Sequence, residues 1–134
     1  MLTSNQTIRV RYDEVDKMGY VYHGNYAKYF HMSRTSLLRK IGISDKKLES
    51  QNIIMPVIEI NIKYLKPVFY DDQIRIKTYL KEVSGIKLKF QHLVFNQQNE
   101  IINKGNSLLV FVNSISRKPI KIPNPIVVKL QSIL

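Results

Sequence analysis

The segment from Tyr12 to Tyr26 is dense in side chains that can do chemistry. Asp13, Glu14 and Asp16 place three acids within four positions, directly before a predicted helix. A helix N-terminus has unpaired N–H groups and a partial positive charge, so it can stabilise an oxyanion that forms on a carbonyl. A carboxylate in the same loop could attack that carbonyl or activate water. Solvated turn residues or caps are the simpler interpretation, which we adopt for Asp13 and Glu14.

One long helix must position this loop. Apolar residues recur at helical spacing from Tyr26 to Ile41, and Gly42 follows as a C-terminal stop. At about 1.5 Å per residue the helix would span roughly 25 Å, which is long enough for the central packing element of a small domain.

Alternation of apolar and polar residues predicts one strand before this helix and about four after it. Ser84-Gly85 and Asn96–Asn99 are predicted turns between neighbouring strands, and Gly105 indicates a bulge or the close approach of another backbone. The expected strands cover residues 7–12, 58–65, 74–83, 86–95 and 101–112, and a short helix is expected over 126–134. This order predicts an α+β fold in which an antiparallel sheet packs on one helix.

Length and composition bound the class of protein. The 134 residues correspond to a single domain over residues 1–134, and 44% hydrophobic with 23% charged residues excludes disorder for most of the chain. The absence of cysteine excludes a disulfide scaffold, a zinc–thiolate site, an iron–sulfur cluster and a cysteine nucleophile. The chain starts without a signal-like segment and has no long apolar run, so we expect a cytoplasmic protein without a membrane span.

The charge balance favours anionic partners. Lys and Arg number 21 against 10 Asp and Glu, which leaves a formal net charge of +11. The basic pairs Arg39-Lys40, Lys46-Lys47 and Arg117-Lys118 are isolated, and the chain lacks the aromatic signature of an RNA-binding strand. We therefore expect no specific nucleic-acid partner, and we leave open a phosphate-binding role for some of the cations.

An eleven-residue motif in the acidic loop resembles the active-site motif of a known family. The motif reads Asp16-x-x-Gly19-x-Val21-Tyr22-His23-x-Asn25-Tyr26. It resembles the 4-hydroxybenzoyl-CoA thioesterase-like acyl-CoA thioesterases, including their YbgC-type branch. The similarity continues through Ser33-Arg34-Thr35, Leu38, Ile60-x-Ile62-x-Tyr64-x-x-Pro67, Asp71-Asp72, Ser84-Gly85, Arg117-Lys118-Pro119 and Ile122-Pro123. The resemblance implies a hotdog fold, in which a long central helix is wrapped by an antiparallel β-sheet of about five strands.

The resemblance also implies roles for individual residues of the motif. Asp16 corresponds to the catalytic carboxylate, which acts as a nucleophile on the thioester carbonyl or as a general base on water. The backbone N–H of His23 corresponds to the oxyanion donor, and Gly19 permits the loop conformation that brings Asp16 opposite it. Tyr22 and the His23 imidazole also match the motif. For the imidazole we favour a positioning role and leave direct proton transfer open as the alternative. Asn25 is expected to be a cap or loop anchor.

The family hydrolyses acyl-CoA, so the resemblance implies an acyl-CoA substrate and no metal or separate cofactor. Tyr22, Tyr26 and Phe30 are candidates for lining the acyl pocket. Glu59 is expected to face the helix layer or a dimer partner, either as an acid behind the site or as a buried paired carboxylate. The phosphates of CoA require cations, and the candidates are Lys87, Lys89, Arg117 and Lys118.

Two further features of the family matter here. His31 stands where many members have Glu, which bears on the substrate range rather than on the reaction. Members are homodimers with active sites at the subunit interface, or homotetramers formed by two dimers.

The alternatives left open are hydrolysis of an acyl-acyl-carrier protein and a non-catalytic acyl-CoA or nucleic-acid binding module. A hotdog hydratase is disfavoured, because its catalytic His before a Phe-Pro-Gly turn is missing.

Overall fold

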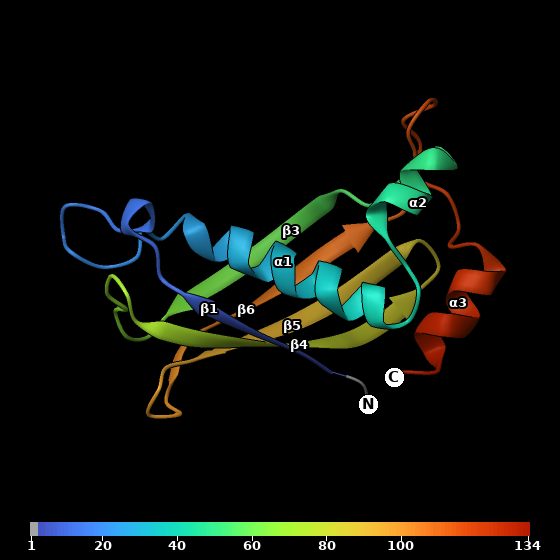
Figure 1. The fold of residues 1–134 in the computed structure, drawn as a ribbon. Helices are drawn as coiled ribbons and strands as arrows, with labels where there is room; N and C mark the ends of the chain where they lie inside the picture. The colour runs from blue at the N-terminus through green and yellow to red at the C-terminus, as the bar shows by residue number, and fades with distance from the viewer. Residues whose placement is uncertain (1–2) are drawn as a thin grey trace.

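The computed structural model describes residues 3–134 as one long helix lying along an antiparallel sheet (Figure 1). The five strands of the sheet have the order β1-β4-β5-β6-β3. They are β1 (Thr3–Arg9), β3 (Val57–Tyr64), β4 (Gln73–Ser84), β5 (Lys87–Phe95) and β6 (Ile101–Val110). The helices are α1 (Asn25–Lys40), α2 (Asp45–Ser50) and α3 (Asn124–Gln131), and a second small sheet pairs β2 (Ile53–Ile54) with β7 (Val112–Asn113). The predicted layout is confirmed.

Several elements differ from the sequence prediction: the first strand, the short elements α2 and β2, and the last predicted strand, which is divided into β6 and β7. The first strand is Thr3–Arg9 rather than 7–12, because the polar residues 4–6 pair with β4 while Tyr12–Glu14 forms a 3-10 turn. The helix α2 was not predicted from the sequence. It is only six residues long, too short for a clear apolar period, and Ser44 caps it by accepting a 3.2 Å hydrogen bond from the Lys47 N–H.

The helix α1 is held close to the sheet by a stacked ring and a glycine. The Phe30 ring stacks on the His92 imidazole at a centroid distance of 4.2 Å. A Cβ at Gly105 would collide with the carbonyl oxygen of Asn61 and with the Phe30 ring. The predicted close approach of another backbone at Gly105 is therefore confirmed, and it involves β3 and α1 together.

A chain of buried polar side chains crosses the interface between α1 and the sheet. Thr78 donates a 2.5 Å hydrogen bond to Ser33, and its Oγ1 lies 2.8 Å from Nδ1 of His92. The other ring nitrogen, Nε2, lies 2.8 Å from the Ser107 hydroxyl, which accepts a 3.1 Å hydrogen bond from Arg34. These directions leave the proton of a neutral His92 on Nδ1, with Nε2 accepting from Ser107.

We expect His92 to make the fold sensitive to acid. Burial, followed by the nearby positive charge of Arg34, lowers the pKa of His92 from 6.5 to about 3. Below pH 6.5 His92 is protonated in the unfolded chain but remains neutral in the folded protein. The free energy of unfolding should therefore fall by roughly 1 kcal/mol per pH unit until about pH 3. Denaturant titrations at about pH 7 and about pH 4 measure this slope. The His92→Gln variant should show a smaller slope than the natural protein, and equal slopes would contradict the assignment.

Candidate active site

The Asp16 carboxylate lies at the first corner of a tight turn. The Gly19 N–H donates to the Asp16 carbonyl at 3.0 Å, and the Asp16 N–H donates to the Tyr20 carbonyl at 3.2 Å. Gly19 has a φ of +88°, in the left-handed region that favours glycine. Oδ1 of Asp16 accepts a 2.9 Å hydrogen bond from the Met18 N–H, and among residues 3–134 no hydrogen bond uses Oδ2. The turn therefore fixes a half-buried carboxylate whose Oδ2 forms no hydrogen bond with the described residues.

Glu14 is buried and anchors the acidic loop to α1, so it is not a solvated turn residue. The other predicted role, a cap, is confirmed, because its side chain accepts from the backbone N–H of the N-cap Arg11. Its carboxylate accepts from the Arg11 N–H at 2.8 Å and pairs with Lys28 at 2.6 Å. Its carbonyl accepts from the Tyr22 N–H at 2.9 Å and from the Asn25 side-chain amide at 2.8 Å. Burial alone would raise the pKa of Glu14, but the hydrogen bonds from Lys28 and the Arg11 N–H lower it overall. Asn25 thus has the geometry of the predicted loop anchor.

The backbone at His23 presents unbonded N–H groups at the start of α1. Among residues 3–134 no hydrogen bond uses the N–H of His23 or of Gly24, the N-cap residue. The carbonyl of the same residue is fixed by two hydrogen bonds: it accepts from the Tyr64 hydroxyl at 3.0 Å and from the Tyr26 N–H at 3.4 Å. The exposed ring of Tyr22 lies 4.3 Å from the His23 imidazole. A fixed, unbonded N–H at a helix N-terminus is the arrangement that stabilises an oxyanion.

A cavity of about 300 Å³ opens beside His23. Tyr26 is buried in its wall with its ring 5.6 Å from that of Tyr64, and burial, followed by Tyr64, raises the pKa of Tyr26 to about 12. Asp16 does not line the cavity, but two other residues of its turn do. The lining residues are Met18, Tyr20, Val21, His23, Tyr26, Tyr64, Leu65, Lys66, Pro67 and Val68. The cavity offers a mainly apolar group a place next to the unbonded N–H of His23.

Residues 10–130 match the model of the Thioesterase-like superfamily. The chain belongs to this superfamily. The Bacillus subtilis (strain 168) protein YneP is 34% identical over 121 residues, which cover 90% of this chain and 88% of YneP. The acyl-CoA thioester hydrolase YbgC of Escherichia coli O157:H7 is 29% identical over 124 residues, 92% of each chain. The crystal structure of a DHNA-CoA thioesterase from Staphylococcus aureus matches with a TM-score of 0.93 and 34% identity, covering 98% of this chain and 90% of that chain.

These similarities confirm the YbgC-type resemblance and the hotdog fold that the motif implied. The protein is a thioester hydrolase. None of the helices within residues 3–134 is both long and apolar enough to cross a bilayer.

Three of the predicted substrate-binding residues of this thioesterase lie on the sheet face away from α1. Glu59, Lys87 and Lys89 are exposed and line another cavity, of about 290 Å³. Their strand neighbours Leu88 and Phe90 point the other way and are buried beneath α1. The expectation that Glu59 faces the helix layer is therefore wrong, and Glu59 is exposed within the single chain. The alternative that it faces a dimer partner stays a prediction.

The other predicted cations lie at the opposite end of the thioesterase domain from Asp16. Arg117 and Lys118 belong to an exposed turn after β7, which the Asn113 N–H closes by donating to the Lys118 carbonyl at 2.9 Å. This turn lies near α2, beyond the C-terminal end of α1 (Figure 1). Because the 16 residues of α1 span about 24 Å, the two cations are remote from the His23 end of the same chain.

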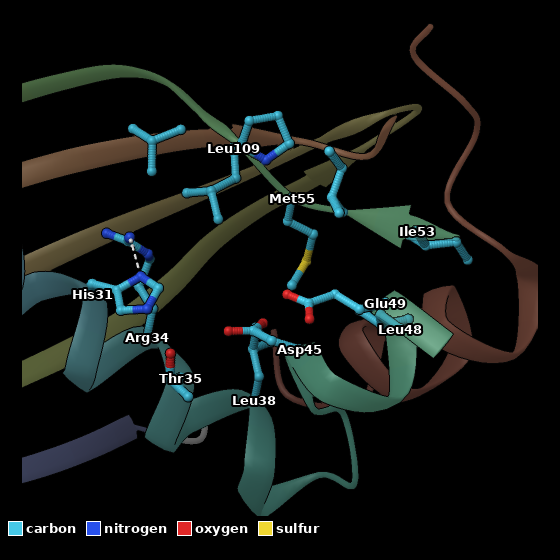
Figure 2. A pocket seen from close by; sticks show the side chains of 13 residues that line it. His31, Arg34, Thr35, Leu38, Asp45, Leu48, Glu49, Ile53, Met55 and Leu109 are labelled. Carbon is cyan, nitrogen blue, oxygen red and sulfur yellow. Dashed lines mark hydrogen bonds between the residues drawn. The ribbon is translucent and has the colours of Figure 1, made fainter. Parts of the chain in front are cut away.

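A cluster of polar residues around Arg34 was not predicted as part of a site. Arg34 and His31 from α1 share a cavity with Asp45 and Glu49 from α2 (Figure 2). The Arg34 guanidinium lies 3.3 Å from Nδ1 of His31. No signal within the sequence indicated the burial of Arg34, because Ser107, Asp45 and Glu49 come from other elements.

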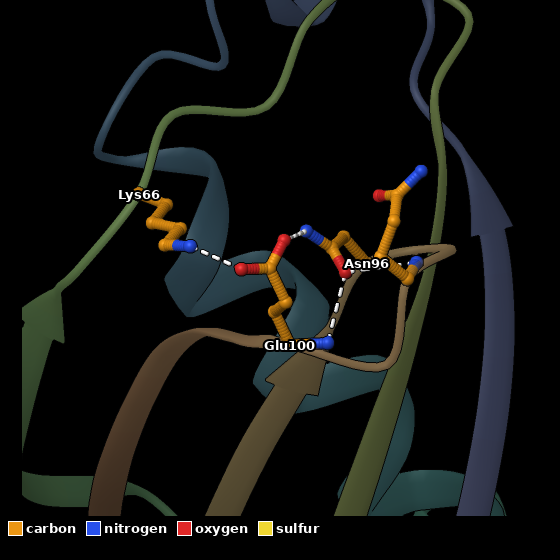
Figure 3. Close-up of polar contacts among 4 residues, drawn as sticks. Lys66, Asn96 and Glu100 are labelled. Carbon is orange, nitrogen blue, oxygen red and sulfur yellow. Dashed lines mark hydrogen bonds and ion pairs between the residues drawn. The ribbon is translucent and has the colours of Figure 1, made fainter.

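Lys66 lines the His23 cavity, and the sequence analysis did not predict this cation as a site residue either. Its ammonium group pairs with the Glu100 carboxylate, and this hydrogen bond lowers the pKa of Glu100 (Figure 3). Asn96 holds the same carboxylate through a 3.0 Å hydrogen bond and accepts from the Glu100 N–H at 2.9 Å. The predicted turn after β5 therefore also tethers a lysine at the site.

Proposed function

We propose that this enzyme hydrolyses acyl-CoA thioesters to a free carboxylic acid and CoA. The observation that carries the proposal is the unbonded N–H of His23 at the start of α1, next to a cavity and to the turn that holds Asp16. The names of the relatives support it, since one is an acyl-CoA thioester hydrolase and another a DHNA-CoA thioesterase.

The reaction needs a nucleophile and a site for negative charge. The thioester carbonyl oxygen accepts a hydrogen bond from the His23 N–H, and the dipole of α1 favours the charge that develops there. Asp16 either removes a proton from the water that attacks the carbonyl carbon, or attacks that carbon itself to form an anhydride that water cleaves. In both routes the C–S bond breaks, its electron pair leaves with the sulfur of CoA, and one water is consumed.

We also propose that the active unit is a homodimer paired along β3. This strand is an edge of the sheet, and its apolar residues Val57, Ile58, Ile60 and Tyr64 are between 38% and 52% exposed. An exposed apolar edge strand is a template for pairing with another strand. If two copies pair there as antiparallel neighbours, the start of β3 in one copy lies beside the end of β3 in the other.

In such a dimer, the cations that are remote from His23 in their own chain can bind the substrate of the partner chain. Lys87, Lys89, Arg117 and Lys118 lie toward the end of the sheet opposite the His23 cavity of their own chain. Antiparallel pairing brings that end toward the His23 cavity of the other copy. These four residues remain candidates for the CoA phosphates, supplied to the partner's substrate.

The outer face of the sheet favours a dimer over a tetramer built by stacking two sheets. Cations outnumber acids on this face. The cations include Arg9, Lys63, Arg75, Lys77, Lys87, Lys89 and Lys104, and the acids include Glu59 and Glu82. Stacking two such faces would oppose like charges. The basic face fits the phosphates of CoA and an acidic acyl-carrier protein alike, so the carrier must be tested directly.

The test of the proposal is release of free thiol from short, medium and long acyl-CoAs, an aromatic acyl-CoA and an acyl-acyl-carrier protein. Hydrolysis of a CoA thioester supports the proposal. Hydrolysis of the carrier-protein thioester alone would show that the acyl-carrier protein, rather than CoA, carries the acyl group. If the folded protein hydrolyses none of these thioesters, the assignment of this substrate class is overturned.

The oxyanion role of His23 belongs to its backbone, so two substitutions should have different effects. His23→Ala keeps the N–H and should retain most of the turnover, whereas His23→Pro removes it and should lower kcat by about 100- to 1000-fold. Thiol release measures both variants, and thermal unfolding checks that His23→Pro is folded. A large loss in His23→Ala instead would assign the chemistry to the imidazole.

A further inference from the structure

A groove lies between α2 and α3, at the end of the domain opposite the start of α1 (Figure 1). This α2–α3 groove has a volume of about 210 Å³. Its lining residues are Gly42, Ile43, Ser44, Lys47, Leu48, Gln51, Pro123, Pro125, Ile126 and Lys129. None of these residues lines the His23 cavity, so the two spaces are separate.

The floor of the α2–α3 groove is apolar and continuous with the hydrophobic core. Ile43 and Leu48 are 4% and 5% exposed and belong to the same core cluster as Leu130 of α3. Ile126 is partly buried against this cluster, and Pro125 at the start of α3 is exposed. An apolar group placed in the groove would remove this remaining apolar surface from water, which is favourable.

Two lysines line the same groove without an acidic partner. Lys47 comes from α2 and Lys129 from α3, and both are exposed. No ion pair or side-chain hydrogen bond within residues 3–134 uses either ammonium group. None of the described residues that line the groove is Asp or Glu, because the two acids of α2, Asp45 and Glu49, line the cavity at Arg34 instead. The groove therefore has a local excess of positive charge.

The backbone that carries these two cations is well defined. A Cβ added at Gly42 would lie 3.5 Å from the ammonium nitrogen of Lys129, so this cation lies against the C-terminal end of α1. The dipole of α1 favours a positive charge at that point. Ser44 fixes the start of α2 by accepting a 3.2 Å hydrogen bond from the Lys47 N–H. Both lysines thus extend from elements that are held next to the groove.

The apolar floor and the unpaired cations together select one class of small ligand. An alcohol with a long apolar tail covers the floor but gives the two ammonium groups no counter-charge. A small anion such as acetate pairs with the ammonium groups but leaves the floor in contact with water. A carboxylate with an apolar tail satisfies both parts of the groove.

We propose that the α2–α3 groove binds a free carboxylic acid, with its apolar tail on Leu48 and Ile126 and its carboxylate between Lys47 and Lys129. Only the source of this ligand rests on the proposed function, because hydrolysis of an acyl-CoA releases such an acid. The groove and the His23 cavity lie at opposite ends of α1, which spans about 24 Å. A carboxylic acid in the groove therefore leaves the thioester site open, and the enzyme retains its product while the next substrate binds.

Isothermal titration calorimetry with saturated monocarboxylates of increasing length, at low ionic strength and below the onset of micelles, measures this binding. The carboxylate that fits the groove should bind about 10-fold or more tightly than acetate and than the alcohol of equal length. Lys47→Gln/Lys129→Gln should weaken its binding by about 5- to 10-fold, since exposed charges are partly screened. Lys46→Gln/Lys121→Gln is the matched control: it removes the same charge from exposed positions outside the groove and should keep the natural affinity.

Chemical-shift mapping of the backbone amides shows which space the acid occupies. The same carboxylate should shift the signals of Gly42, Ser44 and Lys47, and Lys47→Gln/Lys129→Gln should abolish these shifts at equal ligand concentration. Shifts confined to residues around His23 would overturn the proposal, as would equal affinities of the double variant and its control. Neither measurement requires turnover, so a protein that binds the acid in the groove but hydrolyses no acyl-CoA would overturn the proposed function alone.

Discussion

Replacing Asp16 by Asn is expected to lower kcat by at least about 100-fold with little change in KM. The amide of Asn can neither take a proton from water nor attack the thioester carbonyl. Its side-chain oxygen can still accept the hydrogen bond that Oδ1 of Asp16 receives from the Met18 N–H, so the turn should persist. Steady-state release of thiol from the preferred acyl-CoA measures the loss of turnover.

Asp13→Asn is the matched control for this substitution. Asp13 is an exposed acid of the same loop, and no side-chain hydrogen bond or ion pair within the described residues involves it. The control loses the same charge three residues away, so it separates the chemistry of Asp16 from a general change of the local field. The control should turn over at the natural rate. A near-normal kcat in Asp16→Asn would remove Asp16 from the mechanism and leave the site without its proposed base or nucleophile.

The geometry of the loop that holds Asp16 could be predicted because it is encoded locally. The turn from Asp16 to Gly19 depends on a glycine with positive φ, and α1 begins at Asn25, one residue before the first apolar position of the predicted helix. The bonds that matter at Asp16 come from residues within four positions along the chain. Short-range contacts of this kind depend on a few adjacent residues, so a motif can describe them.

The environments of Glu14 and Glu59 could not be predicted from neighbouring residues in the sequence. Glu14 is buried because Lys28 reaches it from α1, a contact between residues 14 positions apart. Alternation along β3 places Glu59 on the same face as Asn61, but alternation does not say which face meets α1. That choice is made by the packing of Phe30 against His92 and Gly105, which join three separate elements.

The burial of Arg34 and its hydrogen-bond network could not be predicted from the sequence for the same reason. His92 occupies a position in β5 where an apolar residue is expected, between buried Phe90 and Val94. Its partners come from β4 and β6, and Arg34 completes the chain from α1. A lone His or Arg carries no local signal for such a network, because the hydrogen-bond partners meet only when the sheet and helix have packed.

The edge of β3 is where the proposed dimer can be broken directly. The double variant Ile58→Lys/Ile60→Lys places two cations on an apolar edge whose natural residues are 52% and 38% exposed. Charged side chains on an edge strand oppose pairing with another strand, and two copies would bring four new charges together. We expect the natural protein to have the mass of two 15.7-kDa chains and the variant that of one. Light scattering after size-exclusion chromatography measures both.

Loss of the dimer should also remove activity, because the proposed substrate site combines the cations of one chain with the His23 end of the other. We expect kcat/KM to fall by at least about 100-fold, since half of the binding surface and its positioning of the thioester are lost. Ile115→Lys is the matched control: this residue is 76% exposed in the turn after β7, so the same change there should preserve both mass and turnover. A folded monomer of the double variant with natural kcat/KM would show that each chain contains a complete site.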